Sequence, residues 1–423
     1  MGRRQGEARL GQREGGAESG QLPADEGGLL SRAFLALCLI SFLNGVFTAP
    51  FVSLFPVYVE ADLGEIPLFT AYLRSLTLIL GGIFALVGGR LCELFGLKTT
   101  LLIGMAGSVV TGFVFQASSF WVLTGLLVGM GMAAGPWSAA GQSYLIASAG
   151  ARRLGLGGAL YFLSMTMGHS LGSLATGSVK DSWSFQQLGA AMVGATATVF
   201  VLGLILLPSG ARARPSAGRA GLALWSSYWP LLHRRRVRLL VLLRLSITGF
   251  WGMASLLLPL LVFRVSGSPS TAAYYGGVSL AVASACQLLT GTLRDRCGRF
   301  WPLMVSGAGI AVSALCVGVF AHSLPGLFVF GTALTGTAWA VSTVIPGLID
   351  EVAGPEEKSR VVGLLHMIWS AAMVSGSLAG GYLVELDPRL PFFIGAVMAV
   401  TGTTCGLLLC RHLDRKKNPP PSR

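Results

Sequence analysis

Positively charged and titratable side chains inside long apolar segments are the strongest candidates for chemistry in this sequence. Arg74 and Arg244 lie six or seven residues inside such segments, about 10 Å from the nearer end at 1.5 Å per helical residue. Each guanidinium could reach back to a membrane surface, or could face a cavity and hold an anionic group. His169 and His366 can titrate near neutral pH, as proton carriers or as hydrogen-bonding groups between helices.

The carboxylates lie away from these groups. Of the 18 acidic residues, six are in the terminal segments and twelve are near the ends of apolar segments, so none occupies the centre of one. A mid-membrane carboxylate, the usual proton carrier, is therefore not evident. No H-E-x-x-H motif, paired cysteines or Cys/His cluster occurs, and we expect no metal site, no cofactor and no enzymatic activity.

Twelve apolar segments must position these residues, each long enough to cross a ~30 Å hydrocarbon core as a helix. With 12% charged residues the chain has about half the charged fraction of a soluble domain, which excludes a soluble or disordered protein. The continuous runs also exclude barrel strands, so we predict an all-α polytopic membrane protein. The predicted spans are 33–59, 68–90, 98–117, 120–145, 154–179, 187–207, 238–263, 271–293, 301–321, 324–350, 360–384 and 390–411.

The spans divide into two predicted six-helix bundles, 31–207 and 238–411, joined by a basic linker at 208–237. The remaining segments are a disordered tail at 1–30 and a short tail at 412–423. Of the 31 Lys and Arg residues, three lie on one side of the predicted membrane and two lie within spans, which leaves 26 in the tails or on the other side. The positive-inside rule places that side, with both tails and the linker, in the cytoplasm, so the net charge of +13 implies no nucleic-acid partner.

Two motifs occur once in each half. Residues 89–96 and 291–298 share the pattern G-x-L-x-[DE]-x-x-G at an offset of 202 residues. Residues 172–177 and 376–381 share G-S-L-A-x-G at an offset of 204. Two matches at nearly the same offset indicate a duplication, and duplicated halves are how many secondary transporters are built.

Together these features resemble the major facilitator superfamily, and the second copy of the first motif carries most of the likeness. The residues that match its motif are Gly89, Arg90, Glu93 and Gly96 after the second span, and Gly291, Asp295, Arg296, Gly298 and Arg299 after the eighth. The resemblance implies transport by alternating access, in which two bundles rock about a central site at the bilayer midplane. It also implies that these loops, with Glu351 and Arg360, form a gate on the cytoplasmic face.

The same resemblance implies that the first, fourth, seventh and tenth spans line the central cavity. Their aromatic and amide residues are the expected substrate contacts, together with the amide of the eighth span: Asn44, Phe47, Phe51, Trp137, Gln142, Trp251, Trp339 and Gln287. Such a lining suits a neutral or amphiphilic organic solute, although aromatic residues also serve as ordinary packing.

The chain departs from the drug–proton antiporters of the superfamily at two places. Those proteins usually carry an arginine four residues before a glycine in span four, where this chain has Gly125 before Gly129. They also carry Gly-Pro in span five, where this chain has Gly172-Ser173. Both departures argue against that mode of coupling.

We therefore predict a secondary active transporter of a small organic solute, with efflux of an amphiphilic compound as the first hypothesis. The alternative is uptake or exchange of an organic anion held by Arg74 or Arg244. The expected partners are the solute, the lipid bilayer and H⁺ as a candidate coupling ion, with the protein as a monomer. The expected location is the bacterial inner membrane, with both termini cytoplasmic.

Overall fold

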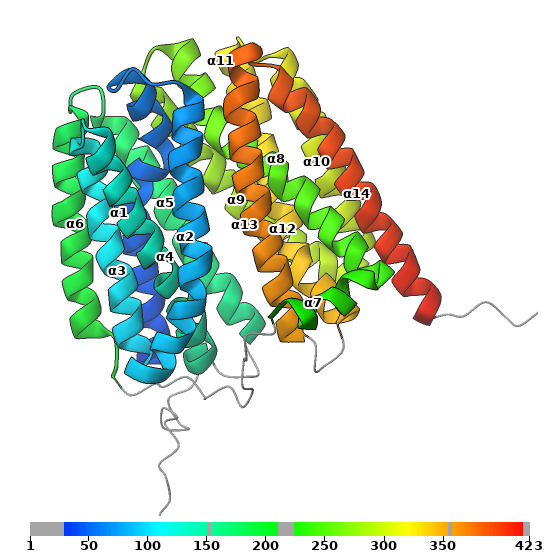
Figure 1. The fold of residues 1–423 in the computed structure, drawn as a ribbon. Helices are drawn as coiled ribbons and strands as arrows, with labels where there is room; N and C mark the ends of the chain where they lie inside the picture. The colour runs from blue at the N-terminus through cyan, green and yellow to red at the C-terminus, as the bar shows by residue number, and fades with distance from the viewer. Residues whose placement is uncertain (1–28, 150–153, 210–223, 354–357, 418–423) are drawn as a thin grey trace, which may run out of the picture.

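The computed structural model describes residues 29–149, 154–209, 224–353 and 358–417. These residues form a bundle of long helices that follow the predicted spans closely (Figure 1). The helices are α1 (Arg32–Ala61), α2 (Pro67–Phe95), α3 (Leu97–Phe113), α4 (Phe120–Ala149), α5 (Leu154–Val179), α6 (Phe185–Leu206), α7 (Leu224–His233), α8 (Arg235–Ser266), α9 (Pro269–Cys297), α10 (Phe300–Val319), α11 (Leu324–Gly326), α12 (Thr332–Val352), α13 (Lys358–Leu386) and α14 (Leu390–Lys417). A 3₁₀ turn (Val114–Gln116) extends α3, and a π-helical turn (Leu327–Gly331) joins α11 to α12.

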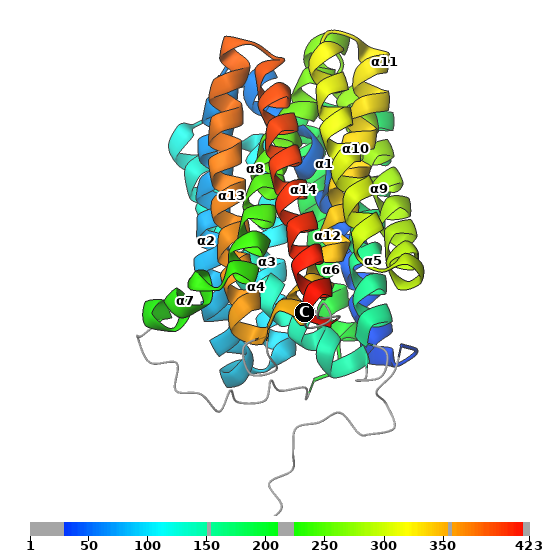
Figure 2. The same cartoon turned by 90° about the vertical axis from the view of Figure 1, so that its right-hand side faces the viewer.

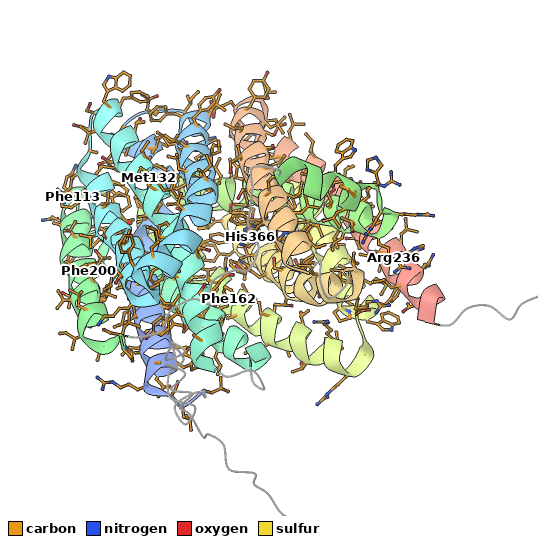
Figure 3. All side chains as sticks on the ribbon, turned by 60° about the horizontal axis from the view of Figure 1, so that its bottom comes forward. Phe113, Met132, Phe162, Phe200, Arg236 and His366 are labelled. Carbon is orange, nitrogen blue, oxygen red and sulfur yellow. The ribbon has the colours of Figure 1, made fainter. Side chains whose placement is uncertain are left out.

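Length and composition make these helices membrane spans. Within the described ranges, eleven helical segments are long and apolar enough to cross a membrane, and α5 is a further long helix of 26 residues. Large apolar side chains cover the outside of the bundle, and Phe113 is an exposed one at its edge in Figure 3. An apolar exterior of this extent matches a hydrocarbon solvent, so the predicted all-α membrane fold is confirmed.

Capping serines and prolines at the first helical position set several of the helix boundaries. Ser31 caps α1 by accepting a hydrogen bond from the backbone N–H of Phe34, and Ser184 forms a capping box with Gln187 at the start of α6. Proline stands at the first position of α2 and α9, where its missing N–H leaves no helical hydrogen bond unmade.

The repeated motif lies in helices rather than in the predicted loops. The stretch from Gly89 to Phe95 forms the last turns of α2, and the stretch from Gly291 to Cys297 forms the last turns of α9. Each helix ends at a glycine with positive φ, Gly96 at 83° and Gly298 at 72°. A glycine is needed there because the chain reverses within one or two residues into the next helix.

The duplication is visible in the backbone. The other two positive-φ glycines, Gly64 (69°) and Gly267 (68°), lie 203 residues apart, just after α1 and α8. The described chain thus divides into α1–α6 and α8–α14, two sets that contact each other mainly through α2 with α13 and α5 with α9. We call them the first and second halves.

Close helix packing also repeats between the halves. A Cβ on Gly172 would lie 2.0 Å from the Val46 carbonyl oxygen, so α5 packs backbone to backbone against α1. A Cβ on Gly376 would lie 1.9 Å from the Gly249 carbonyl oxygen, where α13 packs against α8. In hydrocarbon, where apolar surface gives no preference for protein over lipid, such small-residue contacts hold helices together.

The halves touch more at one end than at the other. α1 begins and α14 ends at the same end of the bundle, near the short helix α7, which projects sideways in Figure 2. We call this the proximal end and the opposite one the distal end. Contacts of α2 with α13 and of α9 with α5 reach Gly82 and Ser284, each 15 residues from the distal start of its 29-residue helix. The halves therefore meet from the distal end to the middle of the bundle.

We expect Gly376→Leu to destabilise the protein, because the side chain would overlap the backbone of α8. Overpacking of this kind costs about 1–3 kcal/mol or more. The measurement is the midpoint of thermal unfolding in detergent. Gly125→Leu is the control, since nothing lies within 4 Å of a Cβ at Gly125. Equal midpoints for the two variants would contradict the α8–α13 packing.

Candidate functional site

One face of α8 presents polar and aromatic residues toward the first half. Trp251 and Ser255 follow Arg244 by seven and eleven residues, which puts the three within about 40° of one another around the helix axis at 3.6 residues per turn. Ser255 accepts a hydrogen bond from Arg74 of α2, 3.2 Å from Nη2, so this face looks across the boundary between the halves.

The hydrogen bond to Ser255 settles the direction in which Arg74 points. Arg74 lies seven residues from the distal start of α2, about 10 Å along the axis, whereas Ser255 lies eleven residues from the distal end of α8, about 16 Å. The guanidinium therefore reaches toward the middle of the bundle and away from the nearer surface. Snorkelling would take it the other way.

Arg244 lies at a different level from Arg74. It is nine residues from the proximal start of α8, about 14 Å deep, and eleven residues from Ser255, about 16 Å along the helix. The two arginines therefore do not converge on one small group. The Arg244 Nε is buried and has no hydrogen-bond partner among the described residues.

His366 faces Arg244 from the neighbouring helix α13. It is eight residues from the proximal start of α13, about 12 Å deep, and its ring lies within electrostatic range of Arg244. It is exposed and lies between the two halves in the view from the proximal end (Figure 3). Ser370, one turn further along α13, approaches Gly82 of α2, which confirms that this face of α13 turns toward the first half.

Two tryptophans lie deeper on the same side. The rings of Trp251 and Trp339 pack edge to face with centroids 6.4 Å apart, which brings α8 and α12 together. The indole Nε1 of Trp339 is buried without a hydrogen-bond partner among the described residues. An unpaired buried donor beside two aromatic rings is a place where a ligand could accept a hydrogen bond.

The other predicted cavity residues lie on α1, α4 and α9. Asn44 is buried in α1, Phe51 stacks on Phe55 with centroids 4.9 Å apart, and Gln287 is half-buried in α9. Phe47 and Trp137 pack against the apolar core of the first half. Gln142 is exposed near the proximal end of α4.

His169 is held by hydrogen bonds within the first half. Its Nδ1 lies 2.9 Å from the Met165 carbonyl oxygen, and its Nε2 lies 3.4 Å from the Thr48 hydroxyl of α1. The ring therefore links α5 to α1, beside the Gly172 contact. Its geometry is that of a hydrogen-bonding group between helices.

Some residues of the predicted cytoplasmic gate form contacts within the second half at the proximal end. Arg299, the residue before α10, forms ion pairs with Glu351 of α12 and with Asp414 of α14. Arg294 of α9 packs directly on the backbone of Gly347. Arg296 is exposed. All of these residues belong to the second half, and the side chains of Arg90, Glu93, Asp295 and Arg360 fall outside the described part of the structure.

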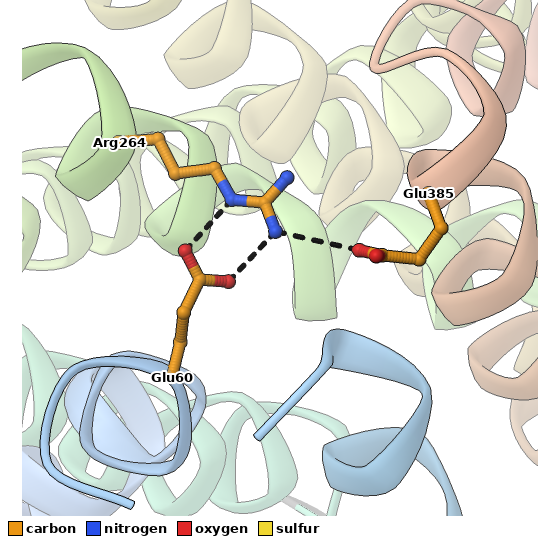
Figure 4. Close-up of polar contacts among 3 residues, drawn as sticks. All are labelled: Glu60, Arg264 and Glu385. Carbon is orange, nitrogen blue, oxygen red and sulfur yellow. Dashed lines mark hydrogen bonds and ion pairs between the residues drawn. The ribbon is translucent and has the colours of Figure 1, made fainter. Parts of the chain in front are cut away.

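An ion-pair cluster at the distal end was not predicted as a site. Arg264 at the end of α8 donates to both carboxylate oxygens of Glu60 on α1, each at 2.8 Å, and to Glu385 on α13 at 3.4 Å (Figure 4). The Glu60 pair crosses between the halves. The sequence did hold a signal, because these opposite charges end three different spans on the same side.

A second charged cluster lies beside the first at the distal end. Ser268, which caps α9, donates to Asp181 after α5 at 3.3 Å and so joins the halves again. Lys180 donates to the Trp183 carbonyl oxygen and lies 3.9 Å from the centre of the Phe185 ring. Burial raises the pKa of Asp62 and lowers the pKa of Lys180, and the opposite charge of each partly offsets the shift of the other.

The polar contacts that the structure describes between the halves lie between the distal end and the middle of the bundle. They comprise the Arg74, Glu60 and Asp181 contacts and three further bonds between α5 and α9, Ser170 to the Gly277 carbonyl, Tyr274 to Ser178 and Ser284 to Thr166. The α8 face with Arg244 therefore lies on the proximal side of this closure.

The fold and the site define a two-bundle membrane protein with a polar and aromatic centre, and sequence comparison gives its family. The family model of the Major Facilitator Superfamily matches residues 37–285 and 250–423. The chain belongs to this superfamily.

Curated relatives are similar over part of their length. The class B tetracycline resistance protein of Escherichia coli is 27% identical over 153 residues, which cover 35% of this chain and 37% of the relative. The multidrug resistance protein MdtH of Aeromonas salmonicida is 25% identical over 195 residues, or 42% and 45% of the two chains. The matched regions thus span less than half of these relatives.

Solved structures show the same fold over nearly the whole chain. The nucleoside transporter NupG aligns with a TM-score of 0.70 at 14% identity and covers 90% of this chain and 99% of its own. A POT family transporter in complex with a thioalcohol-conjugated peptide aligns with a TM-score of 0.75 at 12% identity, covering 90% and 96%.

We expect Glu60→Gln to open the distal end without unfolding the protein. A partly exposed ion pair contributes about 0–1 kcal/mol, enough to shift a balanced conformational equilibrium but not to unfold the bundle. Spin labels at Ser182 and Leu386, one in each half, would report longer distances in the variant. Glu65→Gln, an exposed distal carboxylate, is the control and should leave the distances unchanged. Identical distance distributions for both variants would remove Glu60 from the closure.

Proposed function

We propose that the protein is a secondary active transporter that exports a small organic solute by alternating access. One observation carries the proposal. The polar contacts of the described residues between the halves run from the distal end to the middle of the bundle, while Arg244 on α8 lies nearer to the proximal end. A carrier that receives solute from the proximal side needs this arrangement.

The two clusters of ion pairs fit the two conformations of an alternating-access cycle. The Glu60–Arg264–Glu385 cluster joins the halves and closes the distal end. The Arg299–Glu351 pair lies within the second half at the proximal end, next to the repeated motif. In the outward-facing state the distal pairs would separate, and residues of the repeated motif would join the halves at the proximal end.

An amphiphilic solute fits the centre best. The Trp251–Trp339 pair offers aromatic surface, and a few polar groups around it could orient a ligand. The similar proteins that are named for tetracycline and multidrug resistance support export as the direction. Proton coupling would fall to His366, because His169 is hydrogen-bonded at both ring nitrogens.

The proposed location is the bacterial inner membrane, with the proximal end in the cytoplasm. The basic residues support this orientation, since Arg234, which precedes α8, and Arg235 and Arg236, which begin it, all lie at the proximal end. Export from the cytoplasm then begins with the conformation described above.

Transport is tested by accumulation assays in cells that lack their own exporters. A panel of neutral, cationic and anionic fluorescent amphiphiles would be loaded, and at least one should leave expressing cells faster than control cells. Arg299→Gln should slow that efflux, because it leaves Glu351 without its cation at the proximal end. Arg411→Gln, an exposed residue of α14, should not. Unchanged retention across all three charge classes would overturn the proposed function.

Topology gives a separate test. In a background without the seven native cysteines, Ser209→Cys should resist an impermeant thiol reagent added to intact cells, because the residue follows α6 at the proximal end. Ser182→Cys, exposed in the distal turn after α5, should react. The opposite pattern would invert the proposed orientation.

A further inference from the structure

Arg244 carries a positive charge that no described residue neutralises. It lies about 14 Å from the proximal start of α8. Its Nε is buried without a partner, and no described carboxylate forms an ion pair with it. The described carboxylates at the proximal end, Glu351 and Asp414, are both paired with Arg299. An unpaired charge at this depth in a membrane protein is unfavourable, and residues that carry one usually have a function.

A second arginine adds to the positive charge of the centre. Arg74 lies about 16 Å further along the same boundary and is bonded only to the neutral hydroxyl of Ser255 among the described residues. The sequence places no carboxylate at the centre of any span. A cationic ligand would be repelled here, and a neutral one would leave the charges uncompensated.

Arg238 shows what an arginine without such a role looks like on the same helix. It lies six residues nearer to the proximal end of α8 and is exposed. Water or lipid headgroups can solvate that guanidinium directly. Arg244 shares its helix face with Trp251 and Ser255 and faces the other half, so its charge is directed at the space that the proposed solute would occupy.

We propose that the transported compound is an amphiphilic organic anion, a carboxylate or sulfonate on an aromatic body. Arg244 would hold the anionic group through its planar fork, and the Trp251–Trp339 pair would hold the body. This inference rests on the proposed transport function and specifies its substrate class. Binding from the proximal side neutralises Arg244 before the halves rock, so the loaded carrier moves without an unpaired charge.

The test compares four ligands that share a naphthalene ring and differ only in the polar substituent. 2-Naphthoate, naphthalene-2-sulfonate, 2-naphthamide and 2-(aminomethyl)naphthalene are titrated into the purified protein by calorimetry. The two anions should bind at least tenfold tighter than the amide, and the amine should bind weakest. Arg244→Gln should remove the preference for anions and leave the affinity for the amide unchanged. Arg238→Gln should behave as wild type.

Three results would overturn the inference. They are equal affinities across the four groups, an unchanged preference for anions in Arg244→Gln, and no binding of either anion to the wild-type protein. Failure of the inference and failure of the transport proposal remain distinguishable. If neutral or cationic amphiphiles are exported and Arg244→Gln exports them as well as wild type does, the transport function stands and the anion site falls.

Thermal stability separates a ligand-binding arginine from a structural one. Arg244→Met removes a charge that has no partner in the ligand-free state, so the midpoint of thermal unfolding without ligand should rise. Binding of 2-naphthoate should be lost at the same time. A lower midpoint in Arg244→Met, with wild-type affinity for 2-naphthoate, would make Arg244 a structural residue and refute the proposal.

Discussion

The structure depends on the absence of water from the hydrocarbon core. In that medium a charged group must be paired, moved to a surface or kept for a ligand. The described ion pairs of this chain lie at the two ends of the bundle, Glu60 with Arg264 at one and Glu351 with Arg299 at the other. Arg244 is the contrast, a deep guanidinium with no described anion. The cost of an unpaired charge in hydrocarbon explains why the ion pairs lie at the ends. The same cost is the reason to assign a ligand to Arg244.

Contacts within the halves and between them differ in their polar part. Within each half, helices meet backbone to backbone at glycines, as Gly172 does with Val46 and Gly376 does with Gly249. Between the halves, a Cβ on Gly381 would lie 2.9 Å from the Leu68 Cα, so glycines pack closely there as well. Ion pairs and single hydroxyl bonds are added to this packing, and the Glu60 pair is partly exposed. Close packing has one good arrangement, whereas exposed pairs contribute little and can exchange partners. The polar contacts between the halves therefore contribute little to the stability of the fold.

Prediction from the sequence succeeded where one property of a segment decided the outcome. Apolar length predicted every span to within a few residues, and the duplicated motifs predicted equivalent backbone turns at Gly96 and Gly298. It failed where a helix continued into polar residues, as α2 and α9 do through the repeated motif. Hydropathy falls at those residues, but their backbone hydrogen bonds are satisfied by continuing the helix.

By itself the sequence determined the all-α membrane fold, the repeat and the side on which the basic residues gather, because each follows from local composition and length. The tertiary structure decided which charges meet. Arg74 and Arg244 are equivalent in the sequence, two arginines in apolar helices without nearby acids. The approach of α2 to α8 turns Arg74 inward to Ser255, and packing of α8 on α13 sets Arg244 opposite His366. The direction of a long side chain depends on neighbours that are distant along the chain, and no local pattern records them.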